Sequence, residues 1–182
     1  MGNTYKKDLK NMITILTIIF LLLFLVSFLL YLHGRADIWE TLCITFGVTL
    51  YHFLMRISVG CVFNKILHNN VDYTRKWFQE KFFEKALYKI IRVKKWKQYM
   101  PTYNLDHFNI QNHSLIEIVE AGCQAELVHE TIVLLSFLPI ILIIWFDAGV
   151  VFVLTSFMAA MLDGALVILQ RYNRPRLLRL IR

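Results

Sequence analysis

The sequence predicts an all-α integral membrane protein with four transmembrane helices and an amphipathic interfacial helix. Of the 182 residues, 57% are hydrophobic and 18% are charged, whereas soluble domains carry about 25% charged residues. The apolar residues are gathered into long runs of the length that spans a bilayer. Basic residues flank these runs, which is typical of a protein held against anionic lipid and argues against nucleic acid as the partner.

Four apolar runs are candidates for membrane spans. The first, 12–32, contains no charged residue and follows three lysines, and about 20 apolar residues of helix are enough to cross the hydrocarbon core. Because the run is longer than a signal-peptide core and no A-x-A-like site follows it, we expect an uncleaved span. The other runs are 38–63, 131–146 and 148–169, the last two forming a tight hairpin at Asp147.

Lysine and arginine are distributed unevenly among the segments that connect the runs. They crowd the N-terminal segment, the central segment 64–130 and the C-terminal tail, whereas 34–37 and the connection at Asp147 carry almost none. The positive-inside rule therefore places both termini and the central segment in the cytoplasm. We expect a single membrane domain over residues 1–182.

Within the central segment, basic and apolar residues sort onto different faces of a helix between Asp72 and Lys97. The basic face lies within about 80° and comprises Lys81, Lys85, Lys89 and Arg92. The adjoining face comprises Phe78, Phe82, Phe83, Ala86, Leu87 and Ile90. This pattern is typical of a helix that lies in the membrane interface; the alternative is an amphipathic helix packed on a soluble neighbour. A loop is expected over 102–112.

Ionisable side chains inside predicted spans are rare, and each is a candidate functional group. The second span carries a polar stripe on one helix face, made of Thr41, Thr45, Thr49, His52 and Arg56. In the fourth span, Asp163 is a candidate to neutralise His52 or Arg56 across a close helix contact. Two interpretations stay open: these groups line an active site, or they only hold the bundle together.

The densest polar cluster, HSLIEIVEAGCQAELVHE, precedes the third run. Glu126 and His129 are three residues apart on a helix, so the carboxylate is placed to orient the imidazole as a general base. A straight helix turns Glu120 away from His129, so the two share a site only if the helix is interrupted near Gly122. Di-iron bundles also use E-x-x-H, but the sequence has no second copy, and we expect no metal. The alternative is a polar helix end with surface charges.

The C-terminal segment QRYNRPRLLRLIR carries anion-binding chemistry. Arg171 and Arg174, with Asn173 between them, are spaced to grip a phosphate or carboxylate by bidentate hydrogen bonds. Pro175 is expected to end the helix at Arg174. The alternative is that these charges only set topology and contact lipid head groups.

Three blocks carry a resemblance to a known family. They are RVKKWK at 92–97, E-x-x-x-x-A-E-L-x-H at 120–129 and QRYNRPRL at 170–177. In these blocks, their order and their spacing, the chain resembles the glycosyl-4,4'-diaponeurosporenoate acyltransferases, bacterial membrane enzymes of staphyloxanthin biosynthesis. The chain departs from that pattern at Ala121 and Glu130, where the family tends to have Thr and Trp. The extra carboxylate of Glu130 is expected to raise the basicity of His129 or to indicate another acceptor.

The resemblance implies an enzyme that moves a fatty acyl group to a hydroxyl of a membrane-embedded glycolipid or related lipid. It implies His129 as general base, oriented by Glu126. It also implies a set of substrate-binding residues, with the arginines and Asn173 on the donor's phosphates or the oxyanion. The set is Trp96, Lys97, Glu120, Glu130, Arg171, Tyr172, Asn173 and Arg174.

The same resemblance implies membrane lipids, an acyl donor and a glycolipid-like acceptor as partners, with no cofactor. The donor is expected to be acyl-CoA or acyl carrier protein, and the location the bacterial cytoplasmic membrane. Two alternatives stay open beside the acyltransferase. One is a non-enzymatic accessory protein that docks a partner through its basic segment, and the other is a lipid-modifying transferase that uses another donor.

Overall fold

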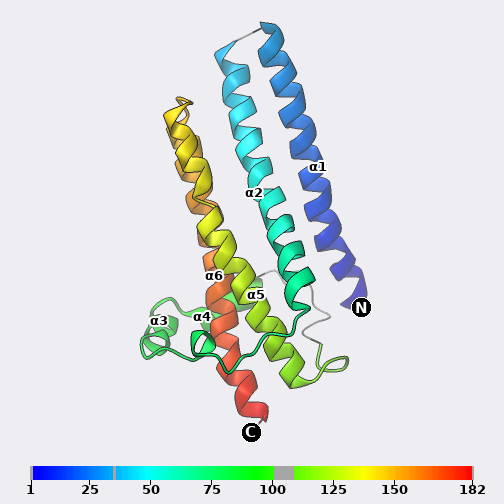
Figure 1. Ribbon diagram of the computed structural model, residues 1–182, viewed down its shortest axis with the longest axis vertical. Coiled ribbons are helices and arrows are strands. Elements are labelled where there is room, and N and C mark those ends of the chain that lie inside the picture. Colours follow the sequence, from blue (N-terminus) through cyan, green and yellow to red (C-terminus); the bar gives the residue numbers. More distant parts are fainter. Residues whose placement is uncertain (1, 35, 101–108, 182) are drawn as a thin grey trace. The chain divides into compact units, whose positions relative to one another are not determined.

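The computed structural model describes residues 2–34, 36–100 and 109–181, with side chains from Asn11 onward. All regular elements within these ranges are helical (Figure 1). Part of the expected loop, 102–108, lies outside the described residues. In chain order the elements are α1 (Gly2–Gly34), α2 (Asp37–Leu67), η1 (Lys76–Phe78), α3 (Glu84–Ile90), α4 (Val93–Trp96), η2 (Lys97–Tyr99), α5 (Leu115–Leu135), η4 (Leu138–Ile144) and α6 (Gly149–Ile181).

Within the described ranges, four helical segments are long and apolar enough to cross a membrane. They are Asn11–Gly34, Asp37–Leu67, Leu115–Ile144 and Gly149–Ile181. The predicted all-α membrane fold with four spans is therefore confirmed. The runs read from hydropathy alone were shorter than these helices, because helices continue through polar residues at their ends.

The described chain folds as two compact units. One comprises Met1–Val59 and Ile132–Leu162, and the other comprises Gly60–Thr131 and Asp163–Arg182. Helices α2, α5 and α6 each contribute residues to both units. The expectation of a single domain stays a prediction.

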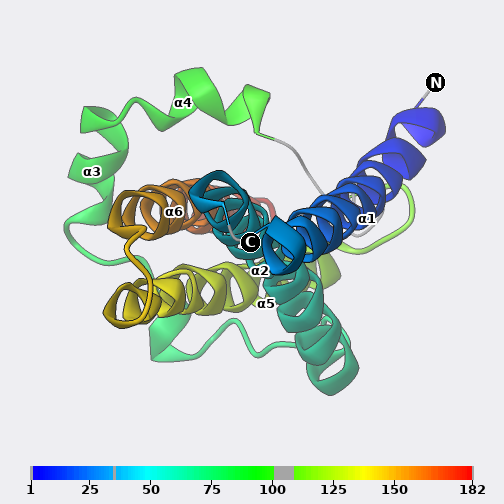
Figure 2. The same ribbon diagram turned by 90° about the horizontal axis from the view of Figure 1, so that it is seen from above.

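In the first unit, α1 and α2 form a helical hairpin (Figures 1 and 2). Phe20 of α1 stacks on Phe53 of α2, with ring centroids 5.5 Å apart. A Cβ at Gly47 would lie 3.1 Å from the Phe24 ring, so the absence of a side chain at this position is what lets the two helices approach. Small residues at close helix contacts are the usual means of packing spans, because lipid supplies no hydrophobic force between them.

The apolar run 131–146, predicted as one span, is divided at Pro139. The α-helical part ends at Leu135, and the chain continues as the 3-10 helix η4. Proline has no N–H to donate, and its ring would collide with the carbonyl four residues earlier, which here belongs to Leu135. That carbonyl instead accepts a hydrogen bond of 2.8 Å from the hydroxyl of Tyr51. The polar side chain thus satisfies a backbone group that lipid could not.

The third span begins at Leu115, well before the predicted 131. Ser114 and Glu117 form a reciprocal cap at its start: the Ser114 amide donates to Glu117 Oε2 over 2.8 Å, and the Glu117 amide donates to Ser114 Oγ over 3.3 Å. This capping box fixes where the helix starts. Helix α5 then runs without a break past Gly122, so Glu120 and His129 point in opposite directions and do not share a site.

The expectation that Pro175 ends the last helix is wrong, because α6 continues to Ile181 with the proline inside it. A proline in a helix interior costs about 3 kcal/mol. Leu177 and Leu178 lie beyond it and pack against a buried cluster that includes Val119 and Cys123 of α5. Partial burial of these two leucines helps to offset the lost backbone hydrogen bond.

The prediction of one amphipathic helix between Asp72 and Lys97 is also wrong. The segment contains the short helices α3 and α4, separated by Arg92, whose φ of 52° lies in the left-handed region. The turn at Arg92 directs Val93 into a buried cluster with Tyr88 and Tyr172. Burial of Val93 therefore decides the path of the chain here, although the periodicity favoured a continuous helix.

The apolar residues of this segment have two different environments. Phe78, expected on the lipid-facing side, is buried against Val71 and Val119. Phe82 and Ile90 are 96% and 77% exposed, beside lysines, which is the composition of a membrane-interface surface. Figure 2 shows α3 and α4 beside α6. Interfacial placement of this surface stays a prediction.

We expect Gly47→Leu to destabilise the α1–α2 hairpin by about 1–3 kcal/mol, because its side chain would be forced into the Phe24 ring. Thermal unfolding of the purified protein in detergent measures this. Gly60→Leu is the matched control, since nothing lies within 4 Å of a Cβ there. An equal loss of stability in both variants would contradict the proposed packing of the hairpin.

Candidate functional site

A buried carboxylate shared by two arginines lies at the centre of the second unit. Glu126 of α5 is 0% exposed. Arg171 Nη1 donates to its Oε1 over 2.5 Å, and Arg174 Nη2 donates to its Oε2. Both arginines come from α6, three residues apart, so one face of that helix presents two guanidinium groups to one carboxylate. Charge-assisted hydrogen bonds of this kind are the strongest that side chains form.

The same arginines hold the segment 77–84 against α6. Arg171 forms an ion pair with Glu84, with its Nη2 2.6 Å from Oε1, and donates to the carbonyls of Trp77 and Gln79 over 3.3 Å. Arg174 donates to the carbonyl of Phe78 over 2.7 Å. The two arginines and the two glutamates balance in charge. This balance allows the cluster to be buried, because a lone charge would be expelled or neutralised.

Tyr88 connects the cluster to the ring of Tyr172 on α6. Its hydroxyl donates to Glu84 Oε2 over 2.9 Å, and burial, followed by this bond to Glu84, raises the pKa of Tyr88 well above its usual value. The Tyr88 ring meets Tyr172 edge to face, with centroids 5.3 Å apart. The Tyr172 ring also receives the Arg176 guanidinium at 3.4 Å and the Lys97 ammonium at 5.3 Å. Tyr172 and Lys97, both predicted to bind substrate, are thus in contact with each other.

A histidine–aspartate pair forms a second polar feature of this unit. His129 Nδ1 lies 2.9 Å from Asp163 Oδ1. The Asp163 side chain is 2% exposed and that of His129 is 22% exposed. The buried carboxylate therefore fixes the orientation of an imidazole that is still partly accessible, which is the arrangement that a general base requires.

The predicted pairing of Glu126 with His129 is wrong. Glu126 contacts the two arginines, and the carboxylate on His129 is Asp163 from another helix. The i,i+3 spacing only made a contact possible. Two guanidinium groups attract a buried carboxylate far more strongly than one imidazole does. The suggested neutralisation of His52 or Arg56 by Asp163 stays a prediction.

Arg171 and Arg174 were predicted to bind a phosphate or carboxylate. They do bind a carboxylate, but it is the side chain of Glu126. All three nitrogens of the Arg171 guanidinium are engaged by Glu84, Glu126 and backbone carbonyls. A donor phosphate would have to displace these contacts. The two arginines therefore have a structural role in this unit, and their donor-binding role stays a prediction. Asn173, which lies between them in the sequence, is half-buried.

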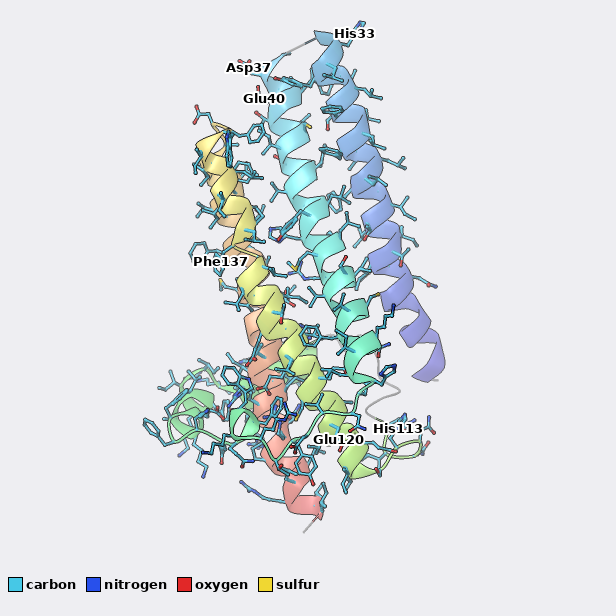
Figure 3. All side chains as sticks on the ribbon, viewed as in Figure 1. His33, Asp37, Glu40, His113, Glu120 and Phe137 are labelled. Atoms are coloured by element: carbon cyan, nitrogen blue, oxygen red, sulfur yellow. The ribbon has the colours of Figure 1, made fainter. Side chains whose placement is uncertain are left out.

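The remaining predicted residues occupy several places in this unit. Trp96 donates its indole N–H to the carbonyl of Ile91 over 2.9 Å, which closes the turn before α4. Glu120 lies toward the N-terminal end of α5 and is labelled in Figure 3. Glu130 accepts a hydrogen bond of 3.0 Å from Trp77 Nε1. Trp77 and Glu84 were missed by sequence reasoning, because no spacing relates either residue to a partner far along the chain.

The polar stripe of α2 lies in the first unit, and its threonines are satisfied by their own helix. Each threonine hydroxyl donates to the carbonyl four residues earlier, over 2.7–3.0 Å, at Thr41, Thr45 and Thr49. Arg56 donates to the carbonyls of His52 and Ala159. These bonds satisfy polar groups within a span, as expected for residues that support a helix bundle.

The family model for glycosyl-4,4'-diaponeurosporenoate acyltransferase matches residues 74–182. The chain belongs to this family. It is therefore a membrane-associated acyltransferase, and the matched region contains both the arginine–glutamate cluster and the His129–Asp163 pair. Comparison with curated proteins and with solved structures finds no significant match.

We expect Glu126→Gln to lower the free energy of unfolding by about 3–5 kcal/mol, because it leaves Arg174 buried without its counter-charge. Thermal or denaturant unfolding of the purified protein measures the loss. Glu117→Gln is the control: its side chain is 59% exposed and glutamine preserves the cap of α5, so its effect should stay within about 0.5 kcal/mol. Equal stability of the two variants would show that the cluster is not what holds this unit together.

Proposed function

We propose that the protein transfers a fatty acyl group from a thioester donor to a hydroxyl of a glycosylated lipid, with His129 as the general base. The observation that supports this most directly is the 2.9 Å contact between His129 Nδ1 and the buried Asp163 carboxylate. The family's description names glycosyl-4,4'-diaponeurosporenoate acyltransferase activity. For this chain we infer the wider class of acceptor, a lipid that carries a sugar.

Asp163 acts as the positioning residue of the proposed reaction. Its carboxylate accepts a hydrogen bond from the Nδ1–H of the imidazole, which leaves Nε2 unprotonated and able to accept a proton. Nε2 removes the proton of the acceptor hydroxyl, and the oxygen attacks the thioester carbonyl. The tetrahedral intermediate collapses with cleavage of the C–S bond, and the departing thiolate takes the proton from Nε2. One ester and one free thiol are formed, with no cofactor.

The arginine–glutamate cluster supports this chemistry without taking part in it. It joins α5 to α6 through Glu126, and these are the helices that carry His129 and Asp163. A base and its positioning group must be held to within fractions of an ångström to be effective. The donor would be acyl-CoA or acyl carrier protein, presented where Trp96 and Lys97 lie.

The proposed location of the reaction is the cytoplasmic face of a bacterial membrane, with the chain crossing the membrane several times. The distribution of lysine and arginine supports cytoplasmic N- and C-termini. The exposed Phe82 and Ile90, beside lysines, are suited to the boundary between lipid and water. An acceptor lipid could then reach the base from the bilayer, and a soluble donor could reach it from the cytoplasm.

We expect His129→Ala to lower the rate of acyl transfer by about 10²–10⁴-fold, the usual contribution of a general base, while the protein still inserts and folds. Asp163→Asn should lower the rate in the same direction, because an amide cannot hold the required tautomer in the same way. The assay follows ester formation by mass spectrometry in membranes that contain each variant. His113→Ala is the control, since His113 lies at the start of α5 beside Glu117. Wild-type activity in His129→Ala would end the assignment of the base.

The proposed orientation predicts which positions a membrane-impermeant maleimide reaches in intact cells. In a chain with its three cysteines replaced, Asp147→Cys should be labelled from outside. Lys85→Cys should be labelled only after permeabilisation, because it lies in the basic central segment. The opposite pattern of labelling would reverse the topology.

A further inference from the structure

An open pocket of about 220 Å³ lies in the second unit, outside the His129–Asp163 pair. Its lining comes from η1, α3, α5 and α6 and includes Trp77, Lys81, Leu87, Glu130, Ile168 and Arg171. Glu130 directly follows His129 on α5, so a wall of the pocket and the proposed base are consecutive residues, turned by about 100° on one helix. A ligand in this pocket would therefore lie beside the proposed reaction.

The walls of the pocket are mostly apolar, but four charged side chains also line it. Two of them, Glu84 and Arg171, are paired with each other, which leaves Lys81 and Glu130. Trp77 is 57% exposed, and its indole N–H is fixed by Glu130 Oε2 at 3.0 Å. Among the described residues, Glu130 Oε1 and the Lys81 ammonium have no hydrogen-bond or ion-pair partner. The pocket thus combines a fixed aromatic surface with one acceptor and one donor that are available to a ligand.

The apolar walls and the two available polar groups favour some parts of the substrates over others as the ligand of this pocket. An alkyl chain gains nothing from two charges that it would desolvate. A phosphate would be attracted to Lys81 but would lie near the carboxylate of Glu130, which repels it. A sugar ring is neutral, has an apolar C–H face to lie on an indole, and carries hydroxyls that donate to a carboxylate and accept from an ammonium.

We propose that this pocket binds the sugar ring of the acceptor lipid, with Trp77 as the stacking surface and Glu130 and Lys81 as its hydroxyl partners. The inference rests on the proposed function, because it assigns the acceptor's sugar to a place beside the base. It makes Trp77 and Glu130 determinants of acceptor specificity. Neither residue takes part in the proton transfer.

The test compares two acceptors that carry the same alkyl chain, octyl β-D-glucopyranoside and 1,2-octanediol, with palmitoyl-CoA as donor. We expect Trp77→Ala and Glu130→Gln each to lower the kcat/KM ratio of glucoside to diol by about tenfold or more, the usual effect of losing one hydrogen bond to a charged group. Glutamine still accepts from the Trp77 indole, so this variant removes the charge and retains the wall of the pocket. Trp77→Phe should retain most of the preference, because it keeps an aromatic face.

The control variant is Lys85→Ala, on α3 but outside the pocket lining, paired with Glu80. A glucoside-to-diol ratio near one in the wild type, or an equal loss with both acceptors in the Trp77 and Glu130 variants, would overturn the proposal. A second measurement does not depend on catalysis: methyl β-D-glucopyranoside should change the tryptophan fluorescence of His129→Ala as it does the wild type. The Trp77→Ala variant should lose this change.

Failure of the proposed function and failure of the proposed sugar pocket would give different results. If His129→Ala retains transfer to both acceptors, the proposed base is wrong, whatever the sugar does. If His129→Ala is inactive but methyl glucoside produces the same fluorescence change in Trp77→Ala as in the wild type, the base stands and the sugar pocket is wrong.

Discussion

The second unit depends on one buried carboxylate that is shared by two arginines. Glu126 receives Arg171 and Arg174 from the same face of α6, and the arginines extend to Glu84 and to the backbone around Phe78. Removing Glu126 would leave Arg174 buried without a counter-charge, and removing Arg171 would do the same to Glu84. An unpaired buried charge costs far more than the pair itself contributes. The cluster therefore links three segments that are distant in the sequence.

Packing in the second unit accounts for two features that depart from local sequence preference, the proline inside α6 and the sharp turn at Arg92. Helix α6 passes through Pro175, because Arg174 before it and Leu177 after it are both fixed by packing. The chain turns sharply at Arg92, because the turn buries Val93 beneath the aromatic pair of Tyr88 and Tyr172. In both places tertiary packing outweighs local preference, as it does whenever a burial contribution exceeds a backbone cost of a few kcal/mol.

Much of the fold could be predicted from the sequence, because lipid leaves few alternatives. An uncharged run such as 12–32 must be helical if it crosses the bilayer, and the positions of the spans follow from hydropathy. The boundaries could not be predicted in the same way. The start of α5 depends on a side-chain cap at Ser114. Its end depends on Pro139, and the Leu135 carbonyl that is left free accepts a hydrogen bond from Tyr51.

Several residues of the candidate site could be identified from the sequence, but their partners could not. His129, Glu126 and Arg171 all belong to the site, since spacing and residue type identify chemistry that is unusual in a span. The partner of each residue could not be identified, because a helical side chain can reach several neighbours and the tertiary fold decides which of them it contacts. Asp163 lies 34 positions from His129, and no periodicity within one helix could reveal that contact.

The central proposal is that this protein transfers an acyl group from a thioester to a hydroxyl of a glycosylated lipid. The most direct measurement uses the purified protein in liposomes with an acyl-CoA and a glycosylated lipid, and follows ester and free thiol together over time. The account predicts that both appear in equal amounts, at a rate that rises with the amount of protein. Release of thiol without ester, or formation of neither, would contradict it.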